Sequence, residues 1–107
     1  MTSTTHDPLE ALRVTLEQQF QAHTEHLTEL TAYSRQRDHG GYDPDTLKGL
    51  MESARQGIAD TAHALRRMSE GTYGRCEGCA GQIPVARLEL LPSARFCVPC
   101  QQKRSGA

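Results

Sequence analysis

The chain has 107 residues, of which 36% are hydrophobic and 5% aromatic, and its formal net charge is −1. So short and polar a chain cannot build a large compact core, which favours an elongated shape stabilised by a bound metal. No apolar run approaches the ~20 residues of a membrane span, and no apolar signal segment stands at the N-terminus. We therefore expect a cytoplasmic protein that binds no membrane.

The charge is unevenly distributed along the chain. Residues 1–70 contain 7 Lys and Arg against 11 Asp and Glu, whereas residues 71–107 contain 5 against 2. The C-terminal part is therefore only mildly basic, whereas proteins that bind nucleic acid mainly through phosphates concentrate their basic residues in one patch. Direct sequence-specific DNA binding is not expected.

The first third of the chain predicts a long helix. Residues 1–7 are polar and are expected to form a flexible tail. Asp7 is suited to cap a helix that starts at Pro8. Apolar residues then recur on one helical face, at positions 9, 12, 16, 20, 27 and 30, and no Gly or Pro interrupts the chain up to position 39. We predict a helix over about 8–38.

A turn and a second helix follow. Gly40 and Gly41 favour a turn, and Asp43 with Pro44 repeats the pattern of a helix start. Apolar positions separated by three and four residues then predict a second amphipathic helix over about 44–70.

Two long helices joined by a short turn should pack side by side in opposite directions. We predict a coiled-coil hairpin over residues 8–70 with its tip at about 38–45. Folding the chain about a centre near residue 40 places Phe20 opposite Thr61, in a seam that also contains polar residues. So thin a core needs a stabilising element at its open end, where the remaining residues begin.

Those remaining residues contain all four cysteines of the chain. Cys76 and Cys79 form one C-x-x-C pair, and Cys97 and Cys100 form a second pair after seventeen intervening residues. This spacing is a strong indication of one structural zinc ion, since four sulfurs complete a tetrahedral shell and leave no open position for a substrate. Gly78 is expected to supply backbone freedom for the turn of the first pair.

Other interpretations of the cysteines remain open at this point. Two disulfides would need an oxidising compartment, and a redox-active C-x-x-C usually lies beside a βαβ pattern, which is absent here. An iron–sulfur cluster has different characteristic spacings. We also predict a short strand at Thr72 and Tyr73, and assign residues 71–107 to the zinc finger and a short C-terminal tail.

Nothing in the sequence indicates an enzyme, because it offers no nucleophile–base pair, phosphate-binding glycine loop or open metal site. Four of the five histidines, at 23, 26, 39 and 63, have no metal-ligand spacing and are expected to be ordinary polar or seam residues. Basic residues gather near the finger, where they could contact an acidic partner surface. The candidates for such contacts are Arg66, Arg67, Arg75, Arg87 and Arg95.

From Leu65 onward the chain contains three motifs in order, G-T-Y-G-R-C-E-G-C, then I-P-V-A-R-L, then P-S-A-R-F-C-V-P-C. With these motifs it resembles the DksA/TraR family of zinc-finger proteins. They match the family signature position by position over about 40 residues, and the hairpin before them matches in architecture. The fold class that follows is mainly α, a long antiparallel helical hairpin with a small four-cysteine zinc finger at its open end.

The resemblance implies a bacterial or phage transcription regulator that binds core RNA polymerase directly. In that family the coiled coil enters the secondary channel of the enzyme, acidic residues at the tip approach the active site, the finger braces the base, and the alarmone ppGpp acts with some members. The four cysteines correspond to the family's zinc ligands. The chain resembles a shorter member with a non-standard tip, R-D-H-G-G-Y-D-P-D-T, in which Asp38, Asp43 and Asp45 are the candidate contacts. The alternative hypothesis is a zinc-finger adaptor that binds nucleic acid or another protein through the basic finger.

Overall fold

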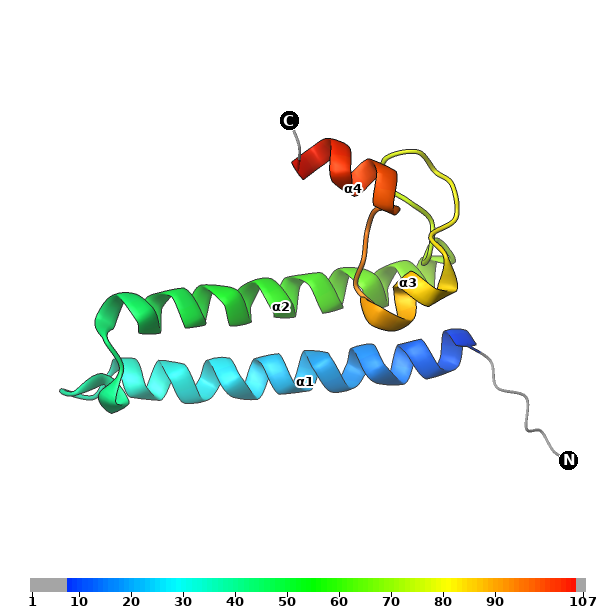
Figure 1. The fold of residues 1–107 in the computed structure, drawn as a ribbon. Coiled ribbons are helices and arrows are strands. Elements are labelled where there is room, and N and C mark those ends of the chain that lie inside the picture. The colour runs from blue at the N-terminus through cyan, green and yellow to red at the C-terminus, as the bar shows by residue number, and fades with distance from the viewer. Residues whose placement is uncertain (1–7, 106–107) are drawn as a thin grey trace, which may run out of the picture.

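The computed structural model describes residues 8–105, and they form a long helical hairpin with a small finger at its open end (Figure 1). The expected fold class is confirmed. The elements in chain order are α1 (Pro8–Ser34), the 3-10 helix η1 (His39–Gly41), α2 (Pro44–Glu70), α3 (Val85–Leu90) and α4 (Val98–Ser105). None of these helices is long and apolar enough to cross a membrane. The expected tail and the cap by Asp7 lie outside the described residues.

The first helix ends at Ser34, before the expected end at about 38. The backbone N–H groups of Arg35 and Gln36 bond to carbonyls three residues back, at 3.2 and 3.0 Å, which tightens and closes the last turn. Gly40 then packs flat against the ring of Tyr33, so closely that an added Cβ would lie 2.6 Å from it. Gly40 has a φ of +62°, which is rarely accessible to other residues. The turn that reverses the chain therefore starts earlier than the sequence pattern indicates.

The second helix has both of its expected end signals. A carboxylate oxygen of Asp43 accepts the N–H groups of Asp45 and Thr46, each at 3.1 Å, and Pro44 occupies the first turn. At the other end Gly71 adopts the left-handed conformation with a φ of 78°. These two signals define α2 as Pro44–Glu70.

The seam between α1 and α2 is apolar near the tip and tighter in the middle. Near the tip, Leu30, Leu47 and Ala54 form a buried cluster. In the middle the ring of His23 lies on Gly57, where an added Cβ would be 2.7 Å from three ring atoms. Phe20, which the sequence places in the seam, is 36% exposed. Thr61, which the sequence places opposite Phe20, is only 2% exposed, so one of the two residues is buried and the other is not.

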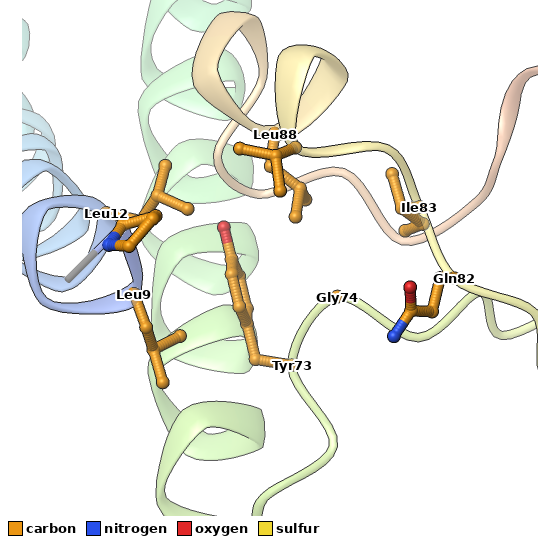
Figure 2. Close-up of a pocket in the computed structure, with 9 residues that line it drawn as sticks. Leu9, Leu12, Tyr73, Gly74, Gln82, Ile83 and Leu88 are labelled. Carbon is orange, nitrogen blue, oxygen red and sulfur yellow. The ribbon is translucent and has the colours of Figure 1, made fainter.

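At the open end one apolar core joins both long helices to the finger. Its buried members are Leu12 of α1 and three finger residues, Cys76, Ile83 and Leu88, and Met68 of α2 packs against them. Figure 2 shows this end of the molecule, where the side chains of α1 face those of the finger. Beside the core lies an open hollow of about 300 Å³, whose lining surface is about equally polar and apolar. The hairpin and the finger therefore share one apolar core.

The prediction of a short strand at Thr72 and Tyr73 is wrong. Residues 8–105 contain no strand, and their single β-bridge pairs Arg75 with Gln82. The Tyr73 side chain turns into the core instead, and its hydroxyl donates to the carbonyl oxygen of Pro92 at 2.7 Å. Burial raises the pKa of Tyr73 to about 12, so the hydroxyl keeps its proton and remains a donor.

Candidate metal centre

The four cysteine sulfurs converge on one point at the base of the finger. All four lie within 4.8 Å of one another, and Cys79 and Cys97 are 3.9 Å apart, sulfur to sulfur. A tetrahedral shell with Zn–S bonds of about 2.3 Å requires sulfurs about 3.8 Å apart, so the cluster has the dimensions of a zinc site. No two of the cysteines form a disulfide. Within the described residues no other group of three or more His, Cys, Asp or Glu could hold a metal.

A glycine lies between the first two ligands because the second cysteine pair approaches its backbone closely, and not because the turn needs backbone freedom. Gly78 has no positive φ, contrary to the role that the sequence suggests for it. A Cβ at this position would instead lie 3.0 Å from the sulfur of Cys100 and 3.2 Å from its Cβ. The first cysteine loop therefore packs directly on the second pair, and this is what brings the four sulfurs together.

Backbone amides prepare one of the sulfurs for metal binding. The N–H groups of Gly78 and Cys97 each point at the sulfur of Cys76, at 3.3 Å. Burial by itself disfavours the thiolate, but the backbone N–H groups of Cys97, Cys79 and Gly78 outweigh it and lower the pKa of Cys76 to about 6. Hydrogen bonds with Cys97 and Cys76, together with burial, raise the pKa of Cys100 to about 12. A divalent cation at the centre supplies the charge that lets all four sulfurs ionise.

Charged side chains next to the cysteines hold the finger against α2. Glu77 lies between the first two ligands, and its carboxylate contacts His63 at 2.6 Å and Arg67 at 3.1 Å. Arg95, two residues before the third ligand, contacts the carboxylate of Asp60 at 3.2 Å. These contacts between the finger and α2 were not predicted from the sequence. The available signal was the spacing of residues 60, 63 and 67, which places them on one face of a helix.

Comparison with known proteins agrees with this geometry. Residues 71–106 match the family model of the prokaryotic dksA/traR C4-type zinc finger. This match includes all four cysteines, so the chain carries a zinc finger of the DksA/TraR type. The cysteine cluster is therefore a site for one zinc ion, the cofactor that the sequence predicts.

Proteins similar to this chain include a transcription factor and a stress protein. It is 38% identical over 66 residues to "General stress protein 16O" of Bacillus subtilis, covering 60% of this chain and 40% of the relative. It is 41% identical over 46 residues to "RNA polymerase-binding transcription factor DksA" of Caulobacter vibrioides, covering 43% of this chain and 32% of the relative. The chain thus spans less than half the length of these curated relatives.

A solved structure shows the same fold over almost the whole chain. The transcription factor DksA2 from Pseudomonas aeruginosa superposes with a TM-score of 0.75 at 22% sequence identity. The superposition covers 92% of this chain and 84% of DksA2, so it includes the hairpin as well as the finger. The shared fold therefore extends beyond the residues that the family model matches.

The five candidate arginines, two at the end of α2 and three in the finger, have different environments. Arg67 of α2 and Arg95 of the finger each form an ion pair between α2 and the finger. Arg87 donates to the carbonyl oxygen of Phe96 at 3.0 Å. Arg66 and Arg75 are exposed. Three of the five therefore contribute to the fold of the protein itself.

The three candidate tip carboxylates are exposed at the closed end of the hairpin, opposite the cysteines (Figure 1). Asp38 accepts the N–H of Gly40 at 3.1 Å, and Asp43 caps α2. Asp45 lies in the first turn of α2, where the positive end of the helix dipole favours a negative charge. Each position has a structural role that is compatible with contact to a partner.

Proposed function

We propose that this protein binds core RNA polymerase and modulates transcription, with the tip of the hairpin inserted into the secondary channel. The observation that carries the proposal is a thin projecting hairpin, with helices of 27 residues, in a chain of DksA/TraR type. A 27-residue helix is about 40 Å long, so the hairpin carries its tip far from the finger. Relatives that carry the name "RNA polymerase-binding transcription factor" support the choice of partner.

In this proposal the acidic tip acts and the finger supports it. Asp38, Asp43 and Asp45 approach the active site of the polymerase, where carboxylates act on bound magnesium or on mobile elements of the enzyme. The zinc finger braces the base of the hairpin through the shared apolar core, so that the tip is held in a defined direction. Such a protein works in the cytoplasm.

The first experiment compares two variants in binding and transcription with core polymerase from the host. The test variant changes Asp38, Asp43 and Asp45 to Asn, because asparagine keeps the capping hydrogen bonds and removes only the charges. The control variant removes three exposed carboxylates farther from the tip, by changing Glu25, Glu70 and Glu89 to Gln.

We expect both variants to bind, and only the tip variant to lose its effect on transcription. If the wild type does not bind the polymerase, the proposed function is wrong. If the tip variant still acts like the wild type, the role of the tip charges is wrong and any effect comes from blocking the channel. Adding ppGpp to the same reactions tests whether this alarmone is a co-effector.

The alternative adaptor function depends on the basic finger. Engagement of Arg67, Arg87 and Arg95 within the protein leaves a smaller positive surface for it. Salt dependence distinguishes the two functions, because phosphate-driven binding weakens with salt by a log–log slope of about 0.9 for each phosphate contact. A shallow slope favours the polymerase hypothesis.

A further inference from the structure

Two charged residues of the finger, one beside each cysteine pair, contact one face of α2. Glu77 lies within the first pair and reaches His63 and Arg67, while Arg95 precedes the second pair and reaches Asp60. A backbone hydrogen bond of 2.8 Å from the N–H of Glu77 to the carbonyl of Arg95 joins the two halves of the finger. Closing the two halves together is what a metal ion bound by both pairs does.

The contacts of Glu77 are partly shielded from water. The exposed fractions of the side chains are 13% for Arg67, 27% for His63 and 28% for Glu77. Pairs at such sites are less screened than fully exposed pairs, and their geometry is held by two helical turns of α2. The contacts of Glu77 with α2 can therefore stabilise the docked finger by a measurable free energy.

From this arrangement we propose that Glu77, Arg67 and His63 form a latch that couples zinc binding to the docking of the finger on α2. Zinc closes the cysteine loops and places Glu77 against α2, and the docked Glu77 in turn holds the loop in the shape that binds zinc. Coupling between two equilibria is reciprocal, so each state stabilises the other by the same factor. His63 and Arg67 are then positioning residues for a metal that they do not touch.

The proposed coupling and simple electrostatics predict opposite changes in zinc affinity when Arg67 is replaced. Replacing Arg67 by Gln removes a positive charge near the metal site, and Coulomb's law alone makes zinc binding tighter. The latch makes it weaker, because the loop that carries Glu77 loses its support. The sign of the effect therefore separates the two explanations.

The test measures zinc affinity of the full chain by competition with a chromophoric chelator. We expect Arg67→Gln and Glu77→Gln to weaken zinc binding about 5-fold to 30-fold, in the range of ordinary coupling energies. Arg66→Gln makes the same charge change one residue away on an exposed position and should leave the affinity within about twofold. The double variant Arg67→Gln/Glu77→Gln should lose little more than Glu77→Gln alone.

Unchanged or tighter zinc binding by Arg67→Gln overturns the proposal, as does full additivity in the double variant. Arg67 also donates to the hydroxyl of Thr72 at 3.3 Å, so His63→Gln serves as a second variant that leaves this bond in place. NMR of the His63 ring gives an independent readout, since its signals should move in the zinc-free protein and in zinc-loaded Glu77→Gln alike. The inference deepens the bracing part of the proposed function, but the experiment contains no polymerase, so either can fail without the other.

Discussion

The contact between His23 and Gly57 predicts opposite effects for two similar substitutions in α2. Gly49 has no heavy atom within 4 Å of an added Cβ, whereas a Cβ on Gly57 would lie 2.7 Å from three atoms of the His23 ring. Both glycines are within a helix, where alanine is favoured by about 1 kcal/mol. Only at position 57 must a neighbouring ring be displaced to obtain that gain.

The expected magnitudes follow from these two terms. Gly49→Ala should stabilise the protein by about 1 kcal/mol. Overpacking at Gly57 costs about 1–3 kcal/mol, so Gly57→Ala should range from neutral to about 2 kcal/mol destabilising. A difference of 1 kcal/mol moves the melting temperature of a domain of this size by about 4–8 °C.

Thermal and urea unfolding of the zinc-loaded protein, followed by helical circular dichroism, measures both variants. The double variant His23→Ala/Gly57→Ala supplies the control, because removing the ring should restore the helix-propensity gain measured relative to His23→Ala alone. If Gly57→Ala is as stabilising as Gly49→Ala, the packing of His23 on Gly57 is refuted.

Three further predictions concern the cap, the metal loop and a buried hydroxyl. Asp43→Ala should destabilise the protein by about 1 kcal/mol in urea unfolding, while Asp43→Asn should cost little because it keeps the cap; equal losses would contradict the capping role. Gly78→Ala should weaken zinc binding about tenfold in chelator competition, since its Cβ would crowd the sulfur of Cys100, and an unchanged affinity would refute the close approach. The raised pKa of Tyr73, about 12 in the folded protein against 10.0, means that stability is fully present below pH 10 and is lost as the pH rises toward 12. Tyr73→Phe should show a smaller loss over that range, and an equal loss would place the titrating group elsewhere.

The sequence was sufficient for features that depend on local signals. The cap at Asp43, the left-handed Gly71 and the spacing of the two cysteine pairs each need only a few neighbouring residues, and the structure contains all three. The assignment to a family depended on the same kind of local pattern, since its motifs lie in one short run of the chain.

Features that depend on distant residues were not predictable in this way. The close contact of Tyr33 with Gly40 beyond the end of α1, and the exposure of Phe20, both depend on how distant parts of the chain pack together. The contacts between the finger and α2 were not predicted, because Glu77 and Arg67 meet only once the finger has folded back. Periodicity tells which face of a helix is apolar, but not which charged residues of another element will reach it.

The position of Leu12 bears on the order in which this chain folds. Leu12 packs in the same core as Cys76 and Leu88, so contacts at the open end close the longest loop in the described chain. Contacts at the tip join residues close in sequence, such as Tyr33 and Tyr42, whose ring centroids are 5.9 Å apart. Since closing a long loop costs more entropy than closing a short one, we expect the hairpin to zip from its tip toward its base. The metal site then belongs to the last part of the molecule to become native, and substitutions at Leu12 should speed unfolding more than they slow folding.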